Sequence, residues 1–123
     1  MQPLLTCIYV GNAVALILHE MDAVRWEEWK LFRLPGGDTG FLGLHVPLLA
    51  MVLVGLVGLE HLTWWGLLIA LAVGLPGLVA FGIHTYQRRG GVAAFGTLPS
   101  RLILWATLVL SLPQIGLSVY ALL

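Results

Sequence analysis

Four long, mostly apolar stretches follow one another along this chain, and they constrain its fold more than any other feature. They cover residues 4–24, 41–59, 63–86 and 101–122. A helix of roughly 20 apolar residues crosses the hydrocarbon core of a bilayer. Only 10% of the 123 residues are charged, whereas soluble domains carry about 25%. The sequence therefore predicts an all-α polytopic membrane protein, with one four-helix transmembrane domain over residues 1–123.

Short polar breaks separate these spans. Residues 60–62 leave room only for a tight antiparallel hairpin between the second and third spans. The first break contains Leu34-Pro35-Gly36-Gly37, which cannot continue a helix because proline and paired glycine interrupt it. We expect Ser100 to be the N-cap of the fourth span. The first span has no basic segment before it and no small-residue cleavage site after it, so we expect a retained helix and not a cleaved signal peptide.

The basic residues all fall on one side of the predicted membrane. Alternation of the spans places residues 25–40 and 87–100 together, opposite both termini and the Glu60–His61 turn. The Lys and Arg residues that gather on or at the edge of that side are Arg25, Lys30, Arg33, Arg88, Arg89 and Arg101. The positive-inside rule puts this side in the cytoplasm and both termini outside.

Residues 25–34 alternate charges with aromatic side chains. On a helix, Trp26 and Trp29 share a face, and Glu27 and Lys30 are three residues apart. We expect a short amphipathic helix that continues the first span along the interface, with its glutamates facing the interface. It would anchor the loop to the lipid bilayer or, alternatively, present the tryptophans to a partner protein.

Small and polar residues inside the spans indicate close helix packing. Asn12 and Gln114 are expected to bond between helices. The glycines that would allow close approach, within the chain or to membrane-protein partners and a second copy, are Gly55, Gly58, Gly74, Gly77 and Gly82.

Three histidines lie at matched depth, just inside the basic side. His19 falls near the end of the first span, His45 about one turn into the second, and His84 near the end of the third. Asp22 shares a helix face with His19, whereas Glu20 points roughly 100° away. Ionisable side chains at membrane depth are costly, and they often mark functional sites.

This set predicts a metal or cofactor site, with other interpretations open. Imidazole and carboxylate suit Zn, Fe or Mn, with His19, Asp22, His45 and His84 as ligands. Glu20 or Asp22 would then be the candidate catalytic base in hydrolysis or oxidation of a lipid-like substrate. Alternatively, His45 and His84 could ligate haem or chlorophyll. The group could also handle protons or ions, or simply satisfy polar groups at the interface.

Part of the chain resembles a family of small bacterial integral-membrane proteins known only as a domain of unknown function. The residues that carry the resemblance are His19-Glu20-Met21-Asp22, Trp26-Glu27-Glu28-Trp29, Leu31-Phe32, Leu34-Pro35-Gly36-Gly37, His45 and Pro47. The resemblance implies a four-helix protein of the bacterial inner membrane and directs attention to the His19 end of the first helix. It implies no reaction.

Three classes of function therefore remain. The first is a membrane protein with a His/carboxylate metal or cofactor site and an unknown reaction. The second is a non-catalytic accessory subunit of a larger complex, and the third is a small transporter or channel, which would need to oligomerise. The net charge of zero leaves no basis for nucleic-acid binding.

Overall fold

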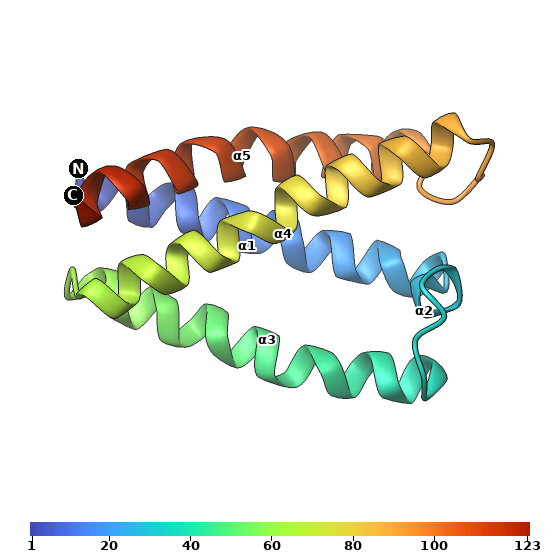
Figure 1. Cartoon of the computed structure of the whole chain (residues 1–123), viewed down its shortest axis with the longest axis horizontal. Coiled ribbons are helices and arrows are strands. Elements are labelled where there is room, and N and C mark those ends of the chain that lie inside the picture. Colours follow the sequence, from blue (N-terminus) through green and yellow to red (C-terminus); the bar gives the residue numbers. More distant parts are fainter.

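The computed structural model describes residues 1–123 and is entirely helical (Figure 1). Its elements are α1 (Gln2–Arg25), α2 (Glu28–Leu31), α3 (Gly37–Glu60), α4 (Trp64–Arg89) and α5 (Leu98–Leu122). The four longer helices are each long and apolar enough to cross a membrane. The predicted all-α bundle with four membrane-spanning helices is thus confirmed.

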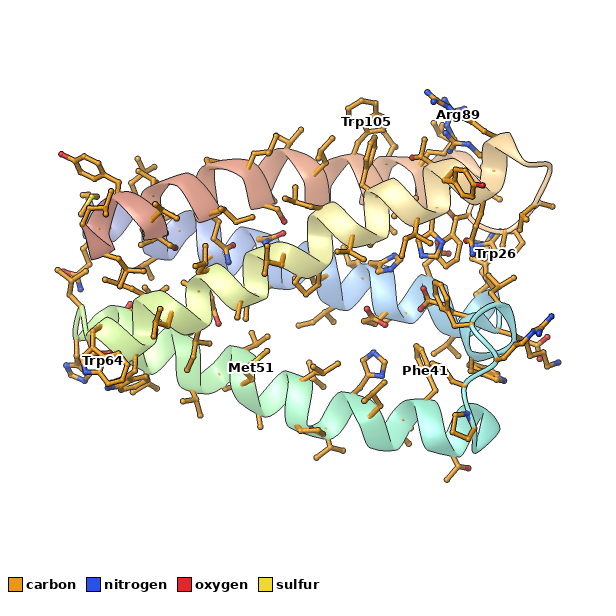
Figure 2. All side chains as sticks on the ribbon, in the orientation of Figure 1. Trp26, Phe41, Met51, Trp64, Arg89 and Trp105 are labelled. Carbon is orange, nitrogen blue, oxygen red and sulfur yellow. The ribbon has the colours of Figure 1, made fainter.

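The bundle has two different ends. The termini and the turn between α3 and α4 lie at one end, which we call the hairpin end (Figure 1). The short helix α2 and the 90–97 loop lie at the other, which we call the basic end because it holds all six Lys and Arg residues. Figure 2 shows Trp64 at the hairpin end and Trp26 and Arg89 at the basic end.

Helix α3 is the outlying member of the bundle. Helix α5 packs against both α4 and α1, while α3 packs mainly against α4 and less extensively against α1. Only 17% of the most apolar window of α3 is buried, against 39% for α1 and for α4. Figure 1 shows α3 and α4 diverging from their shared turn toward the basic end. A groove lined mainly by residues of α1 and α3 lies in that half of the molecule.

Polar side chains join the three inner helices, as predicted. Asn12 Nδ2 on α1 donates to Gln114 Oε1 on α5 at 2.9 Å. Gln114 Nε2 in turn donates to the carbonyl of Ala70 on α4 at 2.7 Å. Because all three residues are buried, this chain of hydrogen bonds fixes the relative register of α1, α4 and α5.

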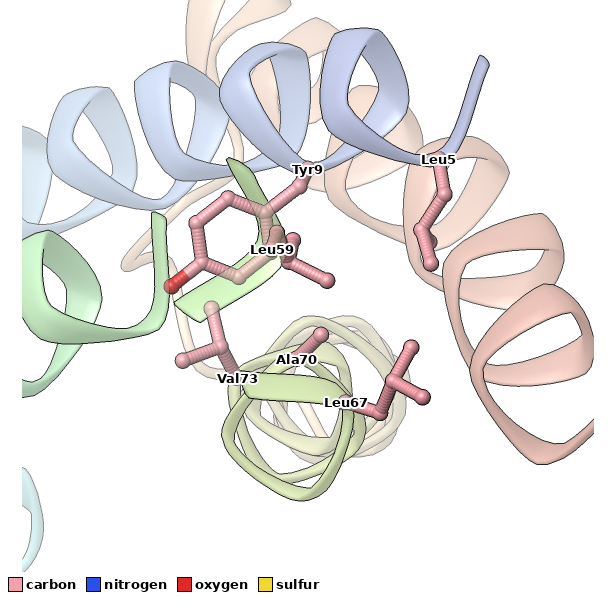
Figure 3. Close-up of a cluster of buried hydrophobic side chains, with 6 residues drawn as sticks. All are labelled: Leu5, Tyr9, Leu59, Leu67, Ala70 and Val73. Carbon is pink, nitrogen blue, oxygen red and sulfur yellow. The ribbon is translucent and has the colours of Figure 1, made fainter. Parts of the chain in front are cut away.

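The hairpin end is closed by glycine contacts and by an apolar cluster. A Cβ on Gly66 of α4 would collide with the backbone of Gly58 on α3, so only glycine allows this approach. Gly82, by contrast, has no atom near the position of an added Cβ and serves no such contact. The cluster that fills this end (Figure 3) consists of Leu5, Tyr9, Leu59, Leu67, Ala70 and Val73.

The start of α5 differs from the prediction. Thr97, and not Ser100, is the N-cap, and its Oγ1 accepts a hydrogen bond from Ser100 N at 3.4 Å. Pro99 therefore lies inside the first turn. Proline is tolerated there because the first N–H groups of a helix have no intrahelical acceptor. The Ser100 hydroxyl instead accepts a hydrogen bond from Trp26 Nε1 at 3.2 Å.

The interfacial segment is less regular than the helical continuation that we predicted. Glu27 adopts a left-handed conformation, with φ of 51°, so α1 stops and the four-residue α2 begins afresh. Trp29 packs against Phe41 of α3, with ring centroids 5.5 Å apart. Trp26 and Trp29 thus both contact their own chain, and they are less available to a partner than a helical face would make them.

Candidate metal centre

Three buried ligating side chains meet at the basic end. His19 comes from α1, Glu28 from α2 and His84 from α4. Their ligand atoms all lie within 4.8 Å of one another. The side chain of His84 is 1% exposed and that of Glu28 10%, so the group is shielded from both solvent and lipid. No other group of three such residues in the chain meets this geometry.

The left-handed turn at Glu27 brings Glu28 into this group. A straight continuation of α1 would carry residue 28 beyond the end of the bundle. The reversal instead sends neighbouring glutamates to opposite sides. Glu27 stays exposed and accepts a hydrogen bond from Lys30 Nζ at 2.7 Å. Glu28 points inward, where its Oε1 lies 2.9 Å from His84 Nε2.

The ring of His84 is held on several sides. Its Nδ1 lies 3.0 Å from Gln87 Oε1, one turn along α4. The amide oxygen can only accept, so Nδ1 donates a hydrogen bond to it. Nε2 and the Glu28 carboxylate oxygen, 2.9 Å apart, need a proton or a metal ion between them, because both atoms would otherwise be acceptors. Phe95 stacks on the imidazole, with centroids 3.8 Å apart. This arrangement fixes the orientation of His84.

Two polar atoms beside this group lack partners. His19 Nδ1 and Asp22 Oδ2 are buried and form no hydrogen bond. The ring of His19 is 5.2 Å from that of His84 and 5.4 Å from that of Phe95, centroid to centroid. An unsatisfied buried polar group costs about 1–3 kcal/mol. Two such atoms on one face of α1 are available to bind a ligand.

A second polar pair lies on the other side of α1. His45 Nδ1 is 2.6 Å from the carbonyl of Phe41, which can only accept, so this nitrogen carries a proton. His45 Nε2 is 2.7 Å from Glu20 Oε2. Glu20 is the more accessible partner, with 35% of its side chain exposed against 13% for His45.

The structure divides the residues that the sequence predicted as ligands. His19 and His84 meet in the buried group, whereas His45 is paired with Glu20. Asp22 borders the group through its unpartnered oxygen but is not one of its three members. The fourth histidine, His61, lies exposed at the hairpin end.

Glu28 is the residue that sequence reasoning missed. The sequence placed it at the interface together with Glu27. Composition cannot show which of two adjacent glutamates points inward. Their opposite orientations depend on the left-handed conformation of Glu27, a residue that is not glycine. The one available signal was the Leu34-Pro35-Gly36-Gly37 break, which forces the chain to turn back toward the bundle shortly after Glu28.

The site could hold a divalent ion with an open coordination position. Zinc bonds of about 2.0–2.1 Å place neighbouring tetrahedral ligands roughly 3.3 Å apart. The separation of 2.9 Å between His84 Nε2 and Glu28 Oε1 is close to that value. The three ligand atoms together lie within 4.8 Å, so side-chain rotations would have to close the set around an ion. Three protein ligands leave a position for water or substrate, as in catalytic zinc sites.

Comparison with known proteins places the chain in a family. No curated protein and no solved structure matches it. The profile of one family does match, and the match covers residues 5–121, which include all four long helices except their outermost residues. The chain therefore belongs to this family of unknown function, DUF6713.

Proposed function

We propose that this chain is an integral membrane protein that binds a divalent transition-metal ion through His19, His84 and Glu28. The observation that carries the proposal is the convergence of three buried donors from three separate elements, with His19 Nδ1 left without a partner. An ion pair between Glu28 and His84 alone would account for two of the three residues. It would not account for a third, unsatisfied imidazole beside them.

The donors favour zinc, iron or manganese. Two imidazole nitrogens and one carboxylate oxygen suit these borderline and hard ions. The contact between His84 Nδ1 and Gln87 supports the same role, because histidine ligands usually donate their other N–H to an oxygen. Neither Lys nor Arg pairs with Glu28, so its carboxylate is free to neutralise an ion.

Asp22 is suited to assist a metal-bound water. It follows His19 by one turn, and its Oδ2 is buried without a partner. Its Oδ1 is 3.7 Å from Arg25 NH1, a distant contact with a half-exposed guanidinium. A carboxylate in this place could accept the proton that a metal-bound water gives up near neutral pH. The reaction class that follows is metal-assisted hydrolysis.

Metal content of purified variants tests the proposal. Wild type, His19→Ala, His84→Ala and Glu28→Gln are purified in detergent, stripped with chelator and reloaded with Zn²⁺, Fe²⁺ or Mn²⁺. We expect one ion per chain in wild type. Each substitution should weaken binding by more than about 100-fold, a larger effect than loss of an outer partner. His61→Ala, an exposed histidine far from the site, is the matched control.

His45→Ala separates the structural ligand set from the one predicted by sequence. Retention of metal by His45→Ala supports the group of three, whereas loss of metal would make His45 a ligand. Wild-type protein that holds no stoichiometric ion after reloading would refute the proposal. An absorbance scan of the same preparations detects haem or chlorophyll, and a bound ring would replace the metal proposal by the tetrapyrrole alternative.

We further propose that the basic end faces the cytoplasm of a bacterial cell and that both termini lie outside. The support is the placement of all six Lys and Arg residues at the basic end. Reporter fusions at each terminus test this orientation. Activity of a periplasmic reporter at both termini is expected, and activity of a cytoplasmic reporter at either would overturn it.

A further inference from the structure

An apolar groove runs between α1 and α3 in the half of the molecule near the basic end. Its volume is about 480 Å³, within the range of small-molecule sites. Val73 and Pro76 of α4 contribute to its wall. The groove exists because α3 diverges from α4 away from their shared turn. It lacks His19, Glu28 and His84, so it is a site distinct from the candidate metal centre.

The groove has the dimensions of one lipid tail. Its wall extends from Ala13 to Val24 on α1 and from Asp38 to Val52 on α3. At ~1.5 Å per residue these stretches are about 16–21 Å long, somewhat more than half of the ~30 Å hydrocarbon core. This length and the volume of about 480 Å³ suit one extended alkyl chain.

The polar residues of the groove lie in the half nearer the basic end. They are Glu20, Asp38, Thr39 and His45, which extend from the basic end to the middle of the α3 wall, and the wall from there to Val52 is apolar. Two of the four are carboxylates, and neither Lys nor Arg lines the groove. Glu20 keeps 35% of its side chain exposed and contacts His45. This half of the groove therefore offers carboxylate oxygens as hydrogen-bond acceptors.

We propose that this groove binds a single-chain amphiphile whose head group is a hydroxyl or an amine. The tail lies along α1 and α3, and the head donates a hydrogen bond to Glu20. Fatty acids and alkyl phosphates are disfavoured because their anionic heads would meet two carboxylates and no Lys or Arg. Access is lateral, because Met21 and Leu42 at the rim are 65% and 70% exposed. The proposal does not depend on a metal ion at the other site.

Photocrosslinking in vesicles tests which amphiphile occupies the groove. The full chain is reconstituted in phosphatidylcholine vesicles with diazirine-bearing probes of equal tail length: a long-chain alcohol, a long-chain amine and a fatty acid. Crosslinked peptides are mapped by mass spectrometry. We expect the alcohol and the amine to label groove residues about tenfold more than the fatty acid does. That ratio corresponds to a difference of about 1.4 kcal/mol.

Three substitutions make the test specific. Leu49→Trp fills the groove, whereas Leu53→Trp adds the same side chain one turn further along α3, outside it. Labelling should fall at least about tenfold with the first and remain unchanged with the second. Glu20→Gln, which preserves the shape of the side chain and the hydrogen bond to His45, should abolish the preference for the amine over the fatty acid.

Two results would overturn the proposal. Equal labelling by all three probes, unaffected by Leu49→Trp and Glu20→Gln, would mean that the groove holds only bulk bilayer lipid. Preferred labelling by the fatty acid would reverse the assigned head-group chemistry. Metal content is measured in the same samples, so that failure of the groove proposal can be distinguished from failure of the metal proposal.

Discussion

The hairpin end and the basic end of the bundle contain the same four helices, but the helices pack differently at the two ends. At the hairpin end, glycines bring backbones together and an apolar cluster fills the space between them. Tyr9 Oη there also donates to the carbonyl of Val52 at 2.7 Å and ties α1 to α3. At the basic end the helices separate, and histidines and carboxylates occupy the interior.

This contrast predicts which end of the bundle contributes more to stability and which end binds ligands. The hairpin end leaves few polar atoms to satisfy, and Ser118 Oγ near the end of α5 is its one buried side-chain atom without a partner. The basic end retains the unpartnered atoms of His19 and Asp22, as well as a groove. Unsatisfied polar groups and exposed cavities persist at functional sites, where stability is exchanged for chemistry. Stability should therefore depend most on the hairpin end and ligand binding on the basic end.

The strongest challenge to this division is Gly66→Ala. The new Cβ would overlap the backbone carbonyl and Cα of Gly58, which cannot rotate away as a side chain could. We expect a loss of about 3 kcal/mol in the free energy of unfolding, at the upper end for overpacking. Unfolding in detergent mixtures, followed by circular dichroism, measures it.

Gly82→Ala is the matched control for that substitution. It lies on the same helix in the other half of the molecule, and an added Cβ would meet nothing. Stability should stay the same or rise by up to about 1 kcal/mol, because alanine favours the helix. If both substitutions destabilised equally, close packing would not be peculiar to the hairpin end.

Metal addition should stabilise the basic end and thereby the whole chain. An ion that binds only the folded protein adds about 2.7 kcal/mol at a concentration 100 times its Kd. We expect this gain on addition of Zn²⁺ to wild-type protein stripped of metal, and not to His19→Ala or Glu28→Gln. The same detergent unfolding, repeated with and without Zn²⁺, gives the value. An equal gain in the His19→Ala protein would place the ion elsewhere.

Loss of the hydrogen bonds that Asn12 forms with Ser111 and Gln114 should have an intermediate effect on stability. Asn12→Leu leaves Gln114 Oε1 and Ser111 Oγ without the donor that both share. We expect a loss of about 1–2 kcal/mol, because interhelical hydrogen bonds in membranes are individually modest. The double variant Asn12→Leu with Gln114→Leu should lose less than the sum of the single variants. Additive losses would show that the two side chains act independently.

The sequence was sufficient for the parts of this fold that depend on local pattern. The apolar stretches predicted the four long helices, and three residues between two spans demanded a tight turn. Asn12 and Gln114 could be assigned to helix contacts because a polar side chain inside an apolar span needs a partner. The approach of His19 to His84 followed from their matched depth, which helical rise fixes.

The remaining features depend on tertiary contacts that no local pattern specifies. Glu28 points inward because Glu27 takes a left-handed conformation, which any sequence-based expectation assigns to glycine or asparagine. His45 pairs with Glu20 and stays away from His84 because α3 is the outlying helix, a property of packing and not of depth. The displaced start of α5 arises from Thr97, since threonine competes with serine for the same capping role.

Substitutions at Glu27 should change stability least, and they test whether this turn positions Glu28. A non-glycine residue in the left-handed region costs about 1–2 kcal/mol, while the exposed pair of Glu27 with Lys30 returns at most about 1 kcal/mol. Glu27→Gly should therefore leave stability unchanged or raise it by up to about 1 kcal/mol, and Zn²⁺ affinity should be retained because the turn still directs Glu28 inward. Glu27→Val, whose branched side chain disfavours this conformation, should weaken Zn²⁺ binding although it removes no ligand. Equal affinities in the two variants, measured by competition with a chelating dye, would mean that this turn does not position Glu28.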